Sequence, residues 1–341
     1  MVVHSLLQLL QGGLVMSSVF ILGGTGFLGY FTVKELLKRG YEVSTVALPP
    51  MPTADLLPPE VECHLGNMHE MTDEQVLEML QGKDMFVYAA GADERIVPEI
   101  PAAKFFYDEN VLPTQRMARL ARKAGVKKFV VYGSYFAHFA EKWEDLELRK
   151  QAYPRTRLLQ EQVAFLEGEG EMVVTSLRLP YIFGTMPGRD PLWTMFLPQV
   201  QGKEFVPVLG GGTAMVTVQQ VAEATIGALE YGKHGEAYAI SDTNMKHQEF
   251  FQIIAEVLGQ KDTVVQVVPK EQVKAAYEQI DKQEAANGRE HGIHLALKAE
   301  MDDRDAYIDP EETMNILKYN KADVRAAIYE TIERCVKVYN N

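Results

Sequence analysis

The sequence predicts an α/β fold, in which a doubly wound parallel sheet is followed by a smaller C-terminal substrate-binding region. Through the first half of the chain, short apolar segments alternate with amphipathic helical segments, an order typical of parallel strands joined by helices. The strand segments are apolar throughout, as expected for strands covered by helices on both faces. A glycine-rich turn joins the first strand to the first helix. Together these observations predict a Rossmann-type sheet.

Each strand of this sheet is predicted from a short apolar run, at residues 18–22, 43–48, 61–65, 85–89, 128–133 and 172–178. Each helix between them is predicted from apolar residues at helical spacing, at residues 27–39, 73–81, 105–124 and 154–168. Gly40 and Gly125 directly follow two of these helices, where glycine commonly ends a helix.

The composition changes after Gly184. Residues 184–213 hold Pro187, Pro191, Pro198, Pro207 and a Gly210-Gly211-Gly212 turn, which predict loops and one short helix near residues 192–200. The later predicted elements are helix 218–231, strand 237–240, helix 247–258, a strand near 264–268, and helices near 270–285 and 310–338. We therefore expect a Rossmann domain over residues 16–183 and a substrate-binding region over residues 184–341. Helix 218–231 and strand 237–240 are expected to return to the first domain.

The composition limits the classes of function. The net charge is −13 and no basic cluster stands out, so neither nucleic acid nor an anionic membrane is an expected partner. No apolar run reaches the roughly 20 residues of a membrane span. Cys63 and Cys335 offer neither zinc spacing nor a disulfide framework, which favours a reducing, cytoplasmic location and no metal.

Residues 1–15 carry no basic segment, so a secretory signal is not predicted. Met16 is a second candidate start, just before the first strand, and codons for Gln11-Gly12-Gly13 can resemble a bacterial ribosome-binding site. We therefore expect a bacterial protein that starts at Met16, with residues 1–15 as a non-native or disordered extension.

The glycine turn is the most informative motif. Gly23, Gly26 and Gly29 join the first strand to the helix that begins near Phe27. Such a turn exposes backbone N–H groups at a helix N-terminus, a geometry that binds a pyrophosphate. A plain tight turn would use the same residues, but the strand before and the helix after favour dinucleotide binding.

Further short motifs follow in a fixed order along the chain. They are Ala89-Ala90-Gly91, Asn110-Val111, Val131-Tyr132-Gly133-Ser134, Tyr153 with Arg157, and Leu177-Arg178-Leu179-Pro180-Tyr181-Ile182-Phe183-Gly184. With this set, from about residue 18 to residue 338, the chain resembles the extended short-chain dehydrogenases/reductases of the NAD-dependent epimerase/dehydratase type. The resemblance implies an NAD(P)-dependent oxidoreductase that acts on a carbonyl or hydroxyl group of a small substrate.

The resemblance also implies catalytic roles. Tyr153 would be the acid/base and Ser134 would hydrogen-bond the reacting oxygen, while the family's lysine, four residues after the tyrosine, is Arg157 here. Arginine keeps the positive charge but cannot lose its proton at a useful pH, so a proton relay through this position would be broken. Three interpretations stay open: turnover with Tyr153 and Arg157, a different chemistry, or dinucleotide binding without turnover.

The cofactor is NAD or NADP. The segment Ala47-Leu48-Pro49-Pro50 offers neither the acidic residue that binds the ribose of NAD nor the arginine that favours NADP, and a slight preference for NADP is expected. Asn67 takes the place of an aspartate that is often found near the adenine. The implied cofactor-binding residues are Gly23, Thr25, Gly26, Phe27, Leu28, Gly29, Leu48, Asn67, Met68, Ala89, Ala90, Gly91, Asn110, Tyr153, Arg157, Pro180 and Tyr181.

The substrate class rests on aromatic residues that either line the crevice or belong to the core: Tyr135, Phe136, Tyr181, Phe183, Trp193 and Phe196. If several face the crevice, a small carbonyl compound fits better than a charged sugar nucleotide. A nucleotide-sugar epimerase and a non-catalytic dinucleotide-binding sensor remain the alternatives. Members of the family often pair through the two helices predicted at 105–124 and 154–168, which implies a homodimer.

Overall fold

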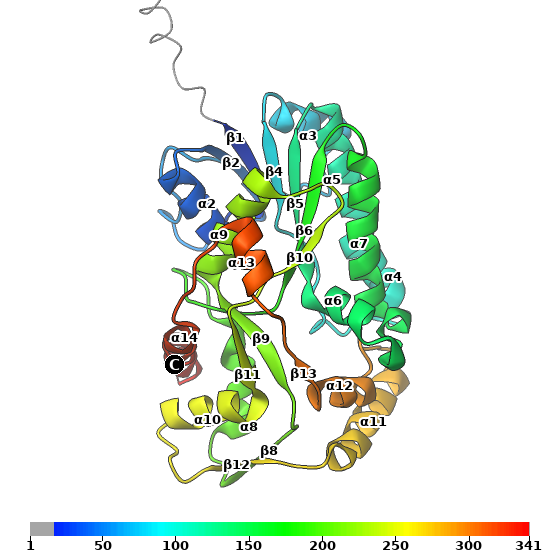
Figure 1. Cartoon of the computed structure of the whole chain (residues 1–341), viewed down its shortest axis with the longest axis vertical. Coiled ribbons are helices and arrows are strands. Elements are labelled where there is room, and N and C mark those ends of the chain that lie inside the picture. The colour runs from blue at the N-terminus through cyan, green and yellow to red at the C-terminus, as the bar shows by residue number, and fades with distance from the viewer. Residues whose placement is uncertain (1–16, 341) are drawn as a thin grey trace, which may run out of the picture.

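The computed structural model describes residues 17–340, and the expectation for residues 1–15 with a start at Met16 lies outside them. The centre of the fold is a seven-stranded parallel sheet with the order β10-β6-β5-β4-β1-β2-β3 (Figure 1). Its strands are β1 (Ser18–Leu22), β2 (Glu42–Ala47), β3 (Glu62–Leu65), β4 (Met85–Tyr88), β5 (Lys128–Ser134), β6 (Val173–Leu179) and β10 (Ala237–Ala239).

Helices cover both faces of this sheet, because successive side chains of each strand point to opposite sides. Val19 and Ile21 of β1 pack in one apolar cluster, and Phe20 and Leu22 pack in another. The first cluster is closed by α2 (Phe27–Lys38), α9 (Val218–Tyr231) and α13 (Glu311–Leu317). The second is closed by α3 (Asp73–Leu80), α5 (Leu112–Lys123) and α7 (Ala152–Gly168). This arrangement confirms the predicted fold class.

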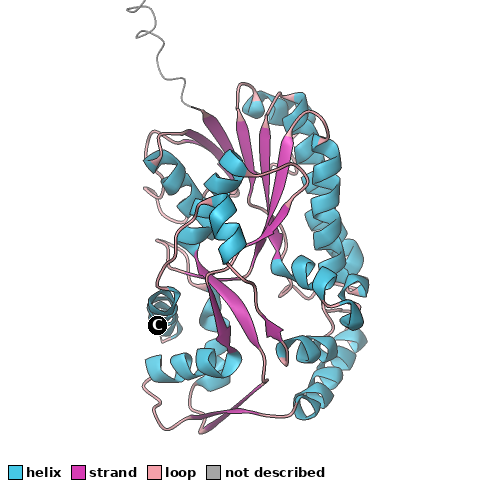
Figure 2. Ribbon diagram, viewed as in Figure 1, coloured by secondary structure: helices cyan, strands magenta, loops and turns pink. Residues whose placement is uncertain are grey.

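A smaller part of the chain lies beyond the carboxyl ends of the large sheet, below it in Figures 1 and 2. Its strands are β7 (Tyr181–Phe183), β9 (Gly212–Thr217), β11 (Thr243–Lys246) and β13 (Asp305–Ala306), together with the separate pair β8 (Phe205–Val208) and β12 (Val264–Val267). Its helices are α8 (Leu197–Val200), α10 (His247–Val257), α11 (Lys270–Ala286), α12 (Leu295–Asp302) and α14 (Val324–Tyr339). The strand β10 pairs with β6 in the large sheet instead.

Two expectations about individual elements were wrong, and one helix was not predicted. Residues 184–213 hold β8 and the start of β9 as well as loops, because these strands find their partners far along the chain at 243–246 and 264–267. The predicted helix 310–338 is two helices, since the chain turns at Lys318, whose φ is 57°. A further helix, α6 (Tyr135–Lys142), follows β5 without an intervening loop, and it begins at Ser134, whose hydroxyl accepts a hydrogen bond from the Phe136 N–H.

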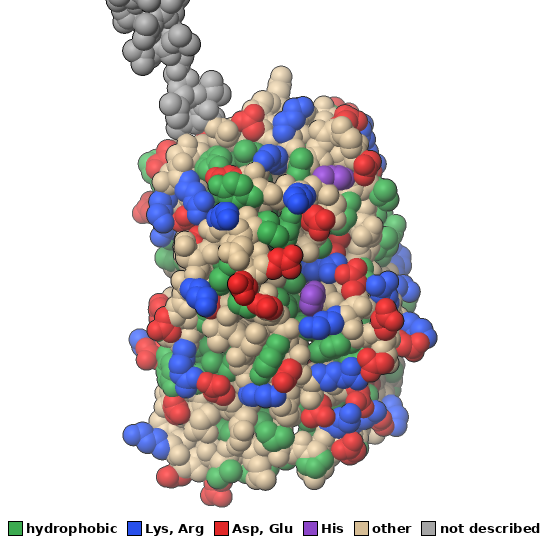
Figure 3. Space-filling view, viewed as in Figure 1, with side chains coloured by type: hydrophobic (Ala, Val, Ile, Leu, Met, Phe, Trp, Pro, Cys, Tyr) green, Lys and Arg blue, Asp and Glu red, His purple; other side chains and the backbone are tan. Residues whose placement is uncertain are grey.

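The predicted helix 105–124 also differs in detail. It begins at α4 (Ala102–Phe106) and continues through a π-helical turn (Tyr107–Val111) into α5. On the face shown in Figure 3, acidic and basic side chains are interspersed. None of the helices described is long and apolar enough to cross a membrane.

Candidate active site

The glycine turn lies at the switch point of the sheet, where β1 is flanked by β4 on one side and by β2 on the other. The Gly24 N–H donates to Thr45 Oγ1 at 3.0 Å, and this hydroxyl donates in turn to the Ile21 carbonyl at 2.7 Å. A Cβ added at Gly29 would lie 2.1 Å from the Gly23 oxygen, so this approach of helix to turn requires glycine. Thr45, on the second strand, was missed in the sequence.

The first turn of α2 has no side-chain cap and can therefore bind an anion. Its N-cap is Gly26, which has no side chain to cap the helix, and the first turn holds no acidic residue. The backbone N–H groups of this turn therefore have no side-chain acceptor, and they point toward the space where a negative group would gain from the helix dipole. The turn fits the pyrophosphate of a dinucleotide.

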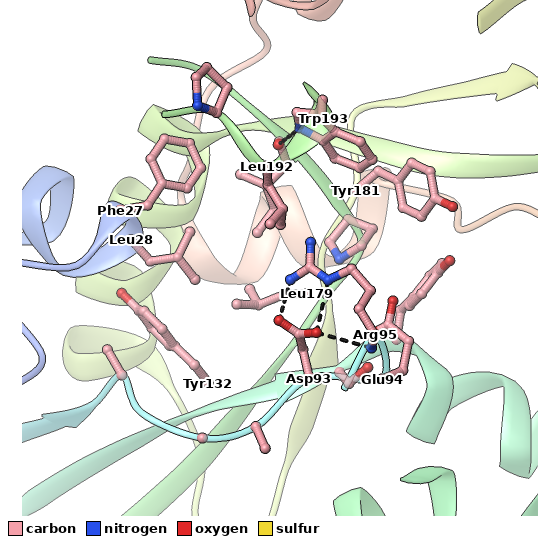
Figure 4. Close-up of a pocket in the computed structure, with 18 of the residues that line it drawn as sticks. Phe27, Leu28, Asp93, Glu94, Arg95, Tyr132, Leu179, Tyr181, Leu192 and Trp193 are labelled. Atoms are coloured by element: carbon pink, nitrogen blue, oxygen red, sulfur yellow. Dashed lines mark hydrogen bonds and ion pairs between the residues drawn. The ribbon is translucent and has the colours of Figure 1, made fainter. Parts of the chain in front are cut away.

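A cavity of about 500 Å³ lies beside this turn, over the carboxyl ends of β4, β5 and β6 (Figure 4). Its walls come from the start of α2, the segment after β4, the end of β5, the start of α6, α7, and residues 179–195. These predicted site residues line it: Phe27, Leu28, Ala89, Ala90, Gly91, Ser134, Tyr153, Arg157, Pro180 and Tyr181. Segments that are far apart in the sequence therefore meet in one place.

Tyr153 and Arg157 are one helical turn apart on α7 and are both buried. Arg157 Nη1 donates to Tyr153 Oη at 2.8 Å, and Nη2 donates to the Tyr132 carbonyl oxygen at 2.5 Å. Arg157 Nε is buried and has no hydrogen-bond partner within residues 17–340. The guanidinium is thus fixed between the phenol and strand β5.

Burial raises the pKa of Tyr153 to about 12, since a phenolate loses its hydration inside the protein. The positive charge of Arg157 and the Ser134 hydroxyl oppose this rise, while the carboxyl of Glu94 adds to it. At neutral pH the phenol is therefore protonated in the unliganded protein. In this form the hydroxyl can donate a hydrogen bond or a proton.

The C-terminal part of the chain holds Tyr153 in place. The Tyr153 N–H donates to the Gly292 carbonyl at 2.8 Å, and a Cβ at Gly292 would lie 2.8 Å from the Cβ of Tyr153. The phenol ring packs edge-on against Phe106 and Phe136, with centroid distances of 5.2 and 5.8 Å. Sequence analysis missed Gly292, because nothing in the local sequence links it to a residue so distant along the chain.

Other predicted cofactor residues lie outside the cavity lining. Gly23, Thr25, Gly26 and Gly29 form the turn itself, and Leu48 is exposed after β2. Met68 is buried in the core, and Asn67, which follows β3, donates to Glu70. Asn110 is buried and bonds both backbone groups of Ala92, accepting from its N–H at 2.8 Å and donating to its oxygen at 3.0 Å. It thereby supports the segment after β4.

The aromatic residues divide between the cavity and the core. Tyr135, Phe136, Tyr181 and Trp193 line the cavity. Phe183 and Phe196 instead stack on Trp193 in the apolar cluster of the C-terminal part. The sequence alone could not make this division, because it depends on which face of β7 meets α14 and α10.

Charged residues that the sequence analysis did not assign to the site also line the cavity, namely Asp93, Glu94, Arg95, Arg189 and Asp190. Three of them lie two to four residues after the Ala89-Ala90-Gly91 motif, and that position was the available signal. Glu161 is fully buried and pairs with Arg178 at 2.7 Å, so it is a core ion pair. His138 lies on helix α6.

Residues 17–340 hold no group of three or more metal-ligating side chains that could bind an ion. His291 bonds to Asp281 at 3.1 Å.

Comparison with known proteins gives the family. The model of the NAD dependent epimerase/dehydratase family matches residues 19–241, and the chain belongs to this family. The resemblance predicted from the motifs is therefore confirmed.

Two relatives have named activities. A human protein named sterol-4-alpha-carboxylate 3-dehydrogenase, decarboxylating, is 26% identical over 207 residues, which cover 58% of this chain. The chain spans about half of that relative, 52% of its length. A Stigmatella aurantiaca protein named 4-hydroxy-2-methyl-3-oxo-4-farnesyl-3,4-dihydroquinoline-1-oxide ketoreductase is 25% identical over 261 residues, which cover 72% of this chain and 74% of that protein.

Solved structures share the fold over nearly the whole chain. The crystal structure of gox2253 aligns with a TM-score of 0.74 at 20% identity and covers 94% of this chain and 98% of that one. MoeE5 in complex with UDP-glucuronic acid and NAD aligns with a TM-score of 0.66 at 18% identity, over 94% of this chain and all of that chain (100%).

Proposed function

We propose that the protein oxidises a secondary alcohol, or reduces the corresponding ketone, on a small apolar substrate that contains a ring. The main support is the hydrogen bond between Arg157 and Tyr153, which meet Ser134 at the wall of one cavity. This contact favours turnover with arginine in the place of the family's lysine, the first of the three interpretations.

In the proposed reaction, Tyr153 transfers the proton of the substrate hydroxyl group. In the oxidising direction, the Tyr153 phenolate removes the proton of the substrate hydroxyl, while the hydrogen on the same carbon leaves as a hydride. The nicotinamide cofactor supplies the acceptor for that hydride. In the reducing direction, the neutral phenol donates its proton to the carbonyl oxygen. Ser134 hydrogen-bonds the reacting oxygen, and Arg157 stabilises the phenolate by its charge.

The cofactor would be held by the N–H groups of the turn Gly23–Gly29 at the pyrophosphate and by Ala89, Ala90 and Gly91 beside the nicotinamide half. NADP is proposed as a second acceptable cofactor besides NAD. The support is that the residues after β2, Leu48-Pro49-Pro50, present no carboxylate to repel a 2′-phosphate.

The proposed substrate class is supported by the cavity wall opposite the glycine turn, where Tyr181, Leu192 and Trp193 lie (Figure 4). Apolar and aromatic walls of this kind hold ring-containing ligands. The names of the two relatives, a sterol dehydrogenase and a ketoreductase of a farnesyl-bearing dihydroquinoline oxide, support the same class. A small molecule, not a nucleic acid, is the proposed ligand, in a reducing cytoplasm where Cys63 and Cys335 remain thiols.

Titration with NADH and NADPH, followed by nicotinamide fluorescence, is the first test. We expect saturable binding, and then NAD(P)-dependent oxidation of cyclic secondary alcohols such as cyclohexanol. Epimerisation of UDP-glucose without net redox change would favour the nucleotide-sugar epimerase instead. Cofactor binding with no turnover of either compound would favour the sensor, and no binding would refute the proposal.

We also infer that two copies pair through α5 and α7. Leu112, Leu159 and Leu166 are exposed on these helices, and Leu166 is 72% exposed. Light scattering after gel filtration should give the mass of a dimer, and Leu166→Glu should shift it to the monomer. A monomer in the unmodified protein would contradict the inference.

A further inference from the structure

An ion pair lies inside the cavity, between the glycine-turn side and the aromatic wall. Asp93 and Arg95, in the segment after β4, both line the cavity (Figure 4). Arg95 Nε donates to Asp93 Oδ1 at 2.8 Å, and Nη2 donates to Oδ2. The Arg95 N–H also donates to Asp93 Oδ1, at 3.0 Å. Asp93 thus orients the guanidinium from one side only.

The other edge of this guanidinium is unused. Arginine has five N–H donors, and those of Nη1 find no acceptor within residues 17–340. Figure 4 places the guanidinium between Asp93 and Leu192, so its unused edge faces the interior of the cavity. A partly buried guanidinium with unpaired donors can bind a planar anion such as a carboxylate through charge-assisted hydrogen bonds.

The remaining cations of the cavity lining are less suited to this role. Arg157 already uses both terminal nitrogens, on Tyr153 and on the Tyr132 carbonyl. Arg189 is exposed at the mouth, where water weakens an ion pair. Arg157 keeps only a buried Nε without a partner. Of the arginines that line the cavity, Arg95 is therefore the one that is partly buried and has an unpaired terminal nitrogen.

The acidic neighbours of Arg95 do not fill the cavity with negative charge. Asp93 is neutralised by Arg95 itself. Burial and the neighbouring Asp93 raise the pKa of Glu94, which makes that carboxyl easier to protonate. The positive charge of Lys298, on α12, opposes this rise in the pKa of Glu94.

We propose that Arg95 determines specificity by binding a carboxylate on the ring-containing substrate, with Asp93 holding the guanidinium in position. This inference rests on the proposed function, since it names the substrate class of the same cavity. Arg95 bridges two carboxylates: Nε and Nη2 remain on Asp93, and the free edge of Nη1 donates to the substrate. No proton or electron moves in this step.

The test compares a cyclic keto acid with its neutral ester, 3-oxocyclohexane-1-carboxylate and the methyl ester, as substrates for reduction by NADH or NADPH. We expect the unmodified protein to prefer the acid in kcat/KM. Arg95→Gln should lower the ratio of acid to ester about tenfold or more, the value of one charge-assisted hydrogen bond. Arg189→Gln, which removes the same charge at the mouth, should keep the ratio.

An unchanged ratio in Arg95→Gln overturns the inference and leaves the oxidoreductase function in place. If neither ketone is reduced, the proposed function fails, and binding then decides the inference. In that case quenching of tryptophan fluorescence by cyclohexanecarboxylate reports on the cavity, which Trp193 lines. Weaker binding to Arg95→Gln supports the carboxylate site, and equal or absent binding in both proteins overturns it. If inorganic phosphate competes equally well with cyclohexanecarboxylate, Arg95 binds a phosphate group, and the assignment of a carboxylate is overturned.

Discussion

One side of the cavity is lined mostly by backbone atoms, and the other side is lined by side chains. The side proposed to bind the cofactor is mostly backbone, a glycine turn and the Ala89-Ala90-Gly91 segment. It is packed so closely that Cβ atoms at Gly23 and Gly29 would meet main-chain atoms within 2.7 Å. The side proposed to bind the substrate is made of side chains from three separate segments, 93–95, 135–136 and 181–195. A backbone surface allows few residue types and leaves a motif in the sequence, whereas a surface of side chains can vary freely.

The largest effect on turnover is expected for Tyr153→Phe, because Tyr153 lies between the two sides of the cavity. Loss of the phenol oxygen removes the proposed acid/base, so turnover should fall by roughly 10²–10⁴-fold while NADH affinity stays unchanged. Initial rates and a fluorescence titration give both values. Tyr30→Phe is the control, because Tyr30 begins a second Tyr-x-x-x-Lys pattern outside the cavity lining. Full turnover in Tyr153→Phe would refute its catalytic role.

On the backbone side, Gly29→Ala should damage both the fold and cofactor binding. The added Cβ would lie 2.1 Å from the Gly23 oxygen, so the turn must open. We expect a loss of about 1–3 kcal/mol in the free energy of unfolding and a weaker NADH affinity. Denaturant unfolding and titration measure them. Gly210→Ala, where the nearest atom lies at 3.3 Å, is the control. Unchanged NADH binding in Gly29→Ala would show that the turn does not hold the cofactor.

The pH dependence of alcohol oxidation tests whether Arg157 lowers the pKa of Tyr153. Oxidation needs the phenolate of Tyr153, whose pKa is about 12, so kcat/KM should rise through the range from pH 7 to 10. Reduction needs the neutral phenol and should change little over that range. Arg157→Gln removes the cation that lowers the pKa, and alcohol oxidation should fall about tenfold, with partial recovery in Arg157→Lys. A plateau of oxidation below pH 8 would contradict this account.

The smallest effect is expected on the side-chain wall, at Leu192→Ala. Leu192 is 52% exposed, so the free energy of unfolding should change by no more than about 0.5 kcal/mol. Lost apolar contact should raise KM for a cyclic ketone roughly threefold and leave NADH affinity unchanged. Ile100→Ala is the control, since Ile100 is 51% exposed outside the cavity lining. A weaker NADH affinity in Leu192→Ala would contradict the separation of the cavity into a cofactor side and a substrate side.

Features that depend on neighbouring residues could be predicted from the amino-acid sequence. Alternating apolar segments predicted the large sheet, and all six predicted strands lie within one residue of their observed ends. The spacing of Tyr153 and Arg157 placed both on one helix face, where they are hydrogen-bonded. Their catalytic roles stay predictions.

Features that depend on contacts between distant residues are seen only in the three-dimensional fold. Gly292 fixes the backbone of Tyr153, and strands β8 and β9 pair with segments far along the chain. The position of Arg95 inside the cavity follows from the turn after β4 that Asn110 supports through Ala92. The physical reason is that local sequence sets backbone propensity over a few residues, while the lining of a cavity is set by packing between segments whose separation no local pattern records.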